Sequence, residues 1–206
     1  MKDRNSGTLI NWNYITISLV VFVALTLMVL YTPWIREIDM EILKTIRKFL
    51  SQFPKYIPVF FSNYGGVGNF WWPQITACAV LVSHRKFLKA FLLVFFTQGS
   101  YILIDVIKNF VCRERPTLHA GYSFPSGHTA ITMCFYGIVI YLILYYVRSQ
   151  FWRIALSVFF GFMIFMVAIS RLWLGVHFPT DVVAGLFFGF MMTNLYIILD
   201  KFFTRN

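Results

Sequence analysis

Two histidines lie beside short polar stretches that separate long apolar blocks of the sequence. His177 precedes Asp181 by four residues, with Pro179 between them at the predicted first turn of a helix. If this turn is helical, the Asp181 carboxylate can accept a hydrogen bond from one imidazole nitrogen and leave the other as a more basic lone pair. That arrangement is typical of a nucleophilic or general-base histidine. The alternative is that Asp181 only caps the helix and interacts with its dipole.

The stretch YSFPSGHTAI, residues 122–131, holds the second histidine at the point where an apolar helix is predicted to begin. The free N–H groups of such a helix start favour an anion, and Gly127 would let the anion approach closely. The Ser126 hydroxyl adds a donor. His128 can then act as an acid for a leaving group. The alternative is an ordinary turn with a histidine at the membrane interface.

Three cations could bind the same anion. Lys108 and Arg115 are seven residues apart, so a helix that continues to Pro116 would place both on one face. Arg171 lies in the second polar stretch. A fixed lysine and the planar fork of an arginine suit a phosphate better than a carboxylate. The sequence has no carboxylate cluster for a metal, so neither a metal nor another cofactor is predicted.

Other ionisable residues of these stretches leave two interpretations open. They either belong to the site or lie at the membrane interface without a chemical role. These residues are Arg113, Glu114 and His119.

The elements that position these residues are predicted to be membrane helices. Of the 206 residues, 59% are hydrophobic and 13% are charged, whereas a soluble domain has about 25% charged residues. Five apolar blocks are each about long enough to cross a bilayer, and a sixth span is predicted from near Tyr56 to Ser83, through NYGGVGN. The prediction is an all-α, polytopic six-helix bundle forming a single domain over residues 1–206. The five blocks are residues 14–31, 87–107, 129–147, 154–170 and 182–199.

Residues 35–50 have apolar side chains on one side of a helical projection and Arg, Glu, Asp and Lys on the other. This pattern predicts an amphipathic helix on the membrane surface, between the first and second spans. A soluble connector helix is the alternative. The first apolar block lacks a small-residue cleavage site, which favours a retained helix over a removed signal.

The net charge of +10 is spread over helix ends and does not form one patch. This distribution indicates membrane topology, and no nucleic-acid partner is predicted. The polar loops 108–127 and 171–181 are separated by two crossings, so they must emerge on the same side. We expect that side to be extracellular or periplasmic, with both termini cytoplasmic. The basic residues assigned to the cytoplasmic side are Lys2, Arg4, Arg85, Lys86, Lys89, Arg148, Arg153, Lys201 and Arg205.

Three segments resemble the signature of the type 2 phosphatidic acid phosphatases. They are KNFVCRERP at 108–116, PSGH at 125–128 and SRLWLGVHFPTD at 170–181. The resemblance covers about residues 100–185, and the length and layout are similar to those of small bacterial members. One local difference is Glu114, where many relatives have proline, and it bears on substrate preference.

The resemblance implies a metal-independent phosphatase of the cell membrane. His177 would attack phosphorus and form a phosphohistidine, with Asp181 orienting it. His128 would protonate the leaving oxygen and later activate water. The residues that the resemblance implies for binding the phosphoryl group are Lys108, Arg115, Ser126, Gly127 and Arg171.

The substrate implied by the resemblance is a phospholipid or a polyprenyl phosphate. Phosphatidylglycerophosphate is the first candidate, with phosphatidate beside it, and undecaprenyl pyrophosphate is the alternative. A membrane transporter is the alternative from another functional class. It would require polar residues near the bilayer midplane, and the blocks 129–147 and 154–170 have almost none.

Overall fold

A computed structural model describes residues 12–65, 70–117 and 119–204. Within these ranges the chain is all-α, as predicted, and no strand is present. The helices are α1 (Trp12–Tyr31), α2 (Ile35–Leu50), α3 (Tyr56–Gly65), α4 (Trp71–Ser83), α5 (Phe87–Val111), α6 (Gly127–Tyr146), α7 (Gln150–Trp173) and α8 (Pro179–Thr204).

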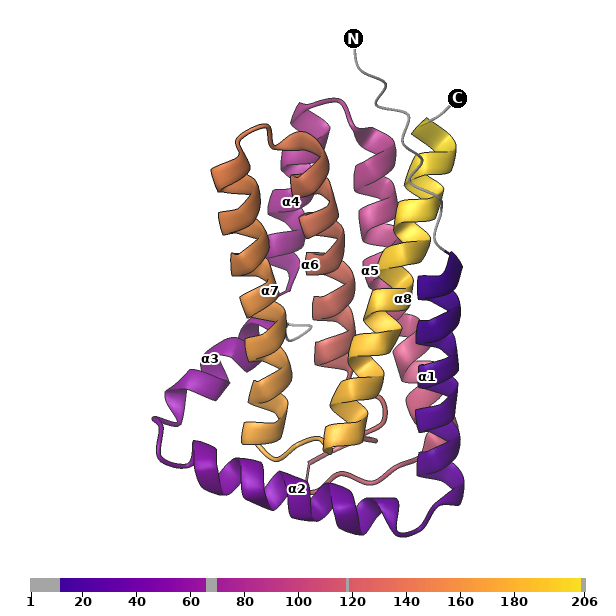
Figure 1. The fold of residues 1–206 in the computed structure, drawn as a ribbon, viewed down its shortest axis with the longest axis vertical. Coiled ribbons are helices and arrows are strands. Elements are labelled where there is room, and N and C mark those ends of the chain that lie inside the picture. Colours follow the sequence, from indigo (N-terminus) through magenta and orange to yellow (C-terminus); the bar gives the residue numbers. More distant parts are fainter. Residues whose placement is uncertain (1–11, 66–69, 118, 205–206) are drawn as a thin grey trace.

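Five of these helices are long and apolar enough to cross a membrane, namely α1, α5, α6, α7 and α8. Each contains most or all of one predicted apolar block. They run side by side, and α2 crosses beneath them at the end where α7 stops and α8 starts (Figure 1). The end of α8 lies at the opposite end of the bundle, whereas α1 starts beside the middle of α8, where Tyr14 packs against Phe190.

The region expected to form one further span contains two helices. α3 has 10 residues and α4 has 13, so neither is long enough to cross a bilayer alone. Residues 66–69 of the NYGGVGN stretch lie outside the described residues.

α6 and α8 pack closely because α8 presents glycines to α6. A Cβ atom built on Gly189 would lie 2.4 Å from the carbonyl oxygen of Ala130, and one on Gly185 would lie 2.6 Å from that of Ser126. Small residues at helix interfaces allow this approach in membrane proteins. The first turn of α8 is thereby placed against the start of α6, where the Ser126 N–H donates to the Asp181 carbonyl at 2.9 Å.

α2 extends over the predicted residues, but its inward face differs from the predicted apolar face. Leu43 is buried and packs in a cluster with Phe178 and other residues of α7 and α8. Ile38 and Ile42, in contrast, are 42% and 44% exposed. Asp39, which the pattern placed on the charged side, is only 1% exposed. The prediction for Asp39 was therefore wrong, because its carboxylate has buried partners elsewhere in the chain.

The far end of the bundle carries the described basic residues that were assigned to the cytoplasmic side. Lys89 is buried there and forms an ion pair with Asp200, which also accepts a hydrogen bond from Tyr141 at 2.9 Å. Lys2, Arg4 and Arg205 lie outside the described residues.

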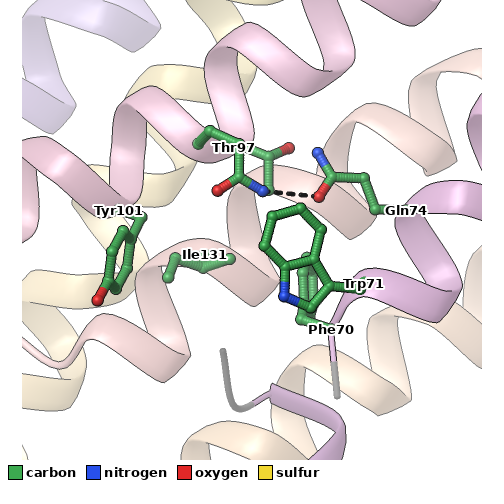
Figure 2. A pocket seen from close by; sticks show the side chains of 7 residues that line it. Phe70, Trp71, Gln74, Thr97, Tyr101 and Ile131 are labelled. Carbon is green, nitrogen blue, oxygen red and sulfur yellow. Dashed lines mark hydrogen bonds between the residues drawn. The ribbon is translucent and has the colours of Figure 1, made fainter. Parts of the chain in front are cut away.

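A small pocket lies where α4, α5 and α6 meet (Figure 2). Its volume of about 20 Å³ is enough for one water molecule. Gln98 donates to the side-chain oxygen of Gln74 at 2.8 Å, while the Gln74 nitrogen has no partner among the described residues. None of the predicted site residues lines it; the lining residues are Phe70, Trp71, Gln74, Thr97, Gln98, Tyr101 and Ile131.

Candidate active site

The two polar loops meet at the end of the bundle that α2 covers (Figure 1). Residues 112–126 connect α5 to α6, and residues 174–178 connect α7 to α8. Arg115 donates to the Val176 carbonyl at 3.0 Å, and Thr117 donates to the Gly175 carbonyl at 3.0 Å. The prediction that both loops emerge at the same end is confirmed, and direct hydrogen bonds join them.

His177 and Asp181 are both buried, with 1% and 0% of their surface exposed. Nδ1 of His177 lies 3.5 Å from Oδ2 of Asp181, which also accepts from the Phe178 N–H at 2.8 Å. α8 begins at Pro179, so the predicted helical turn is present. The two interpretations of Asp181 prove compatible, because one carboxylate oxygen caps the turn and faces the imidazole.

The second nitrogen of His177 faces a cation. Nη1 of Arg115 lies 3.3 Å from Nε2 of His177. A guanidinium only donates, so Nε2 is the acceptor, and this assigns the proton of the neutral ring to Nδ1, toward Asp181. Burial lowers the pKa of His177 to about 4, although Asp181 opposes the shift, and Arg171 and Arg115 lower it further. His177 is thus neutral near pH 7, with a lone pair on Nε2.

Lys108 and Arg115 do not share a helix face. α5 ends at Val111, and Cys112 adopts a left-handed conformation with φ 53°. The prediction that the helix continues to Pro116 is therefore wrong. Arg115 instead reaches the other loop from an extended segment, where it also donates to the Gly121 carbonyl at 3.1 Å.

The start of α6 brings Lys108 and His128 into the same region. α6 begins at Gly127, with Ser126 as an extended N-cap. A Cβ atom on Gly127 would lie 3.8 Å from Nζ of Lys108, so this ammonium lies beside the helix start. The buried Ser126 hydroxyl is paired with the Thr129 hydroxyl at 3.0 Å. His128 is half-buried and within electrostatic reach of His177 and of all three predicted cations.

Arg171 is 5% exposed and donates to the Ser62 hydroxyl, while its Nε has no partner among the described residues. Among the ion pairs of the described chain, none includes Lys108, Arg115 or Arg171. Arg171 is buried, and Lys108 and Arg115 are half-buried. A cation held away from water without a carboxylate partner is costly, so this grouping near the two histidines suits an anion.

No group of three or more His, Cys, Asp or Glu residues within the described ranges could hold a metal ion. The polar side chains that do converge are donors and two imidazoles, a set suited to an anionic substrate.

Arg113 and Asp39, which were not predicted as site residues, belong to a buried network with Asp181. Arg113 donates to Oδ1 of Asp181 and to Oδ2 of Asp39, each at 2.6 Å. Asp39 lies four residues from both Ile35 and Leu43, the other fully inward-facing residues of α2. That spacing was the signal for its burial. Glu114 and His119 are exposed, and Glu114 pairs with Arg36 at 3.1 Å.

The part of the chain that contains both loops is similar to a known protein family. Residues 88–205 match the family model of the PAP2 superfamily. Phosphatidylglycerophosphatase B of Bacillus subtilis (strain 168) is 28% identical over 148 residues, which cover 66% of this chain and 70% of that protein. Lipid phosphate phosphatase delta of Arabidopsis thaliana is 32% identical over 95 residues, 41% of this chain and 22% of that protein.

Two solved structures share the fold. A transmembrane PAP2 type phosphatidylglycerolphosphate phosphatase from Bacillus subtilis superposes with a TM-score of 0.83 at 23% identity, covering 91% of this chain and 96% of that one. Aquifex aeolicus LpxE superposes with a TM-score of 0.60 at 20% identity, covering 77% and 93% of the two chains.

Proposed function

The chain belongs to the PAP2 superfamily and is a multi-pass membrane phosphatase, and we propose that it removes the terminal phosphate of phosphatidylglycerophosphate through a phosphohistidine intermediate. The observation that carries this proposal is the placement of a neutral, buried His177 between Asp181 and Arg115. Arg115 and Arg171 act on His177, and Lys108 acts on the neighbouring His128; none of the three has a carboxylate partner among the described ion pairs. The name of the Bacillus subtilis relative supports the choice of lipid, and phosphatidate is a second candidate.

In the proposed first step, Nε2 of His177 attacks phosphorus, and the bond from phosphorus to the lipid oxygen breaks. His128 gives its proton to that oxygen as the lipid alcohol leaves. Asp181 accepts from Nδ1 and stabilises the ring as positive charge develops. Arg115, which donates to Nε2 in the resting site, would transfer this donor to a phosphoryl oxygen and free the lone pair.

In the second step, His128 takes a proton from water, and the oxygen attacks the phosphohistidine. The bond from phosphorus to Nε2 breaks, which releases inorganic phosphate and restores neutral His177. One acid–base residue serves both steps. His128 gives its proton to the leaving alcohol in the first step, so it is able to accept a proton from the attacking water in the second.

The phosphoryl oxygens would be bound by Lys108, Arg115 and Arg171, with the Gly127 N–H at the start of α6 as a further donor. Fixed cations would supply the charge stabilisation that metal ions supply in other phosphatases, so we propose metal-independent catalysis. The Ser126 hydroxyl could also donate, provided that it turns away from Thr129.

We further propose that α3 and α4 together form a sixth crossing, that α2 lies on the membrane surface, and that the site faces the extracellular or periplasmic side. The described basic residues at the opposite end favour a cytoplasmic location for that end. An impermeant thiol reagent should label an Ala120→Cys variant, made without the native cysteines, in intact cells. Labelling only after lysis would overturn the orientation.

The proposed reaction can be tested with purified protein in detergent, in the presence of a chelator. Initial rates of phosphate release should be compared on phosphatidylglycerophosphate, phosphatidate and undecaprenyl pyrophosphate. We expect the first to be the fastest, and quenching in an alkaline denaturant should trap a phosphoprotein that is stable to base, labile to acid and absent from His177→Asn. Faster release from undecaprenyl pyrophosphate would favour the alternative substrate, and no release from any lipid would refute the proposal.

A further inference from the structure

We propose that α2 is part of the catalytic apparatus, because Asp39 acts through Arg113 to position Asp181 and to set the charge that His177 experiences. This inference rests on the proposed function of His177. It assigns Asp39 and Arg113 as positioning residues, since neither lies among the unpaired cations that would touch the substrate.

Contacts within ion-pair distance lead from α2 to the imidazole, whose Nδ1 has no hydrogen-bond partner among the described residues. The Arg113 guanidinium bridges the two carboxylates, with Nη2 2.6 Å from Asp39 and Nη1 2.6 Å from Asp181. Asp181 then faces Nδ1 of His177 with its other oxygen, at 3.5 Å. A planar guanidinium that uses two nitrogens in this way fixes the orientation of both partners.

Thr180 closes this network. Its N–H donates to Oδ1 of Asp39 at 3.1 Å, and its hydroxyl donates to Oδ2 of the same carboxylate. The same hydroxyl oxygen accepts from Nη1 of Arg113 at 2.7 Å. Asp39 is therefore bound to the first turn of α8 directly as well as through Arg113.

The network is buried and rigidly packed. The side chains of Asp39, Arg113 and Asp181 are 1%, 8% and 0% exposed. The Arg113 guanidinium also lies over the Phe178 ring, 4.2 Å from its centroid. Buried ion pairs persist only when their hydrogen-bonding groups are satisfied, and here each carboxylate has several donors.

The arrangement holds the Asp181 carboxylate from two sides. Oδ1 is bound to Arg113, while Oδ2 is bound to the Phe178 N–H and faces His177. Loss of Arg113 or of its second anchor would allow the carboxylate to rotate away from Nδ1. The result would be a less oriented imidazole rather than a weaker phosphate site.

The charges give a test that separates positioning from packing. Asp39, Arg113 and Asp181 carry a net charge of −1, and Asp39→Asn makes it zero, whereas Arg113→Gln makes it −2. The double variant returns it to −1. The other charged or titratable groups that act on His177 are Arg115 and Arg171, with His128 on α6 and Lys108 beside it, and the variants leave all of them unchanged.

The decisive measurement is the titration of His177 by NMR in the resting protein, made with the pH dependence of kcat/KM. We expect Arg113→Gln to move the protonation of His177 upward by about one pH unit, since a neighbouring charge shifts a pKa by about 1–3 units. Asp39→Asn should move it downward, and the double variant should return it toward the wild-type value. All three should lower kcat by about tenfold or more, with KM little changed.

Matched controls are Glu41→Gln and Arg36→Gln, which remove exposed charges from the same helix. They should leave the titration and kcat unchanged. Equal losses of kcat with an unmoved His177 titration in every variant would overturn the inference and leave α2 a packing element. If the wild-type protein released no phosphate from any lipid while the titration shifted as expected, the proposed function would fail and the positioning network would stand.

Discussion

Replacing Gly185 with alanine tests whether the distance between α6 and α8 controls catalysis. The new Cβ would lie 2.6 Å from the Ser126 carbonyl oxygen and 3.3 Å from the Ala130 nitrogen. These are backbone atoms in the first turn of α6, so they cannot move aside as a flexible side chain could. The two helices must separate instead.

The required separation can be estimated from the contact. Opening 2.6 Å to an ordinary contact distance of about 3.4 Å requires a shift of about 0.8 Å. The neighbouring hydrogen bond from Ser126 N–H to the Asp181 carbonyl, now 2.9 Å, would stretch beyond bonding range. His128 on α6 would then move away from His177 and Asp181. Because a misplacement of about 1 Å can cost about 100-fold, we expect kcat to fall by about 10- to 100-fold.

The free energy of unfolding should change little, because two effects of the alanine oppose each other. Overpacking costs about 1–3 kcal/mol, and alanine returns about 1 kcal/mol of helix propensity relative to glycine. The assay compares phosphate release and thermal unfolding in detergent for Gly185→Ala and for Gly161→Ala, a matched control on α7 with no atom within 4 Å of the added Cβ. If Gly185→Ala retained the kcat of the control, catalysis would not depend on this spacing and the reasoning would be refuted.

Four further predictions concern the two histidines and the exposed Arg36–Glu114 pair. His128→Ala should lower kcat by about 10²–10⁴-fold while equilibrium binding of a lipid phosphate persists; unchanged turnover would remove its acid–base role. Because burial lowers the pKa of His177 to about 4, the loss of kcat/KM that comes from protonation of Nε2 should appear only near and below pH 4; a fall of kcat/KM on acidification through the ordinary histidine value of about 6.5 would contradict this. The same lowered pKa means that protons bind the unfolded chain more tightly, so the contribution of His177 to stability should diminish as the pH falls from about 6.5 toward 4. Glu114→Ala should reduce the free energy of unfolding by less than about 1 kcal/mol, because the Arg36–Glu114 pair is exposed, with side chains 56% and 74% accessible; a larger loss in chemical denaturation would show that the pair matters more than its exposure indicates.

The sequence predicted the main helices and the grouping of the site better than it predicted local geometry. Apolar block length alone located the five long helices, and the count of crossings placed the two loops together. The path of the chain after Val111 was predicted incorrectly. Pro116 disfavours a helical Arg115, and the left-handed Cys112 redirects the chain so that Arg113 and Arg115 contact separate partners.

The partners of Asp39 show which part of the site was not predictable from local pattern, although the spacing to Ile35 and Leu43 indicates that the residue is buried. Its helix has a strong charged face, and an aspartate between Glu37 and Glu41 fits that face by type. Its burial depends on Arg113, 74 residues away in the sequence, and on Thr180, 141 residues away. A periodicity argument describes one helix at a time, so it contains no information about a partner contributed by another loop.

The position of Asp181 in the first turn of α8 has a consequence for biosynthesis. Both histidines and all three cations precede α8 in the chain, but the carboxylate and the glycine face that bring the two loops together arrive with it. A nascent chain therefore carries most of the proposed catalytic groups before they are arranged to react. On the proposed mechanism, activity should appear only when α8 inserts and packs against α6.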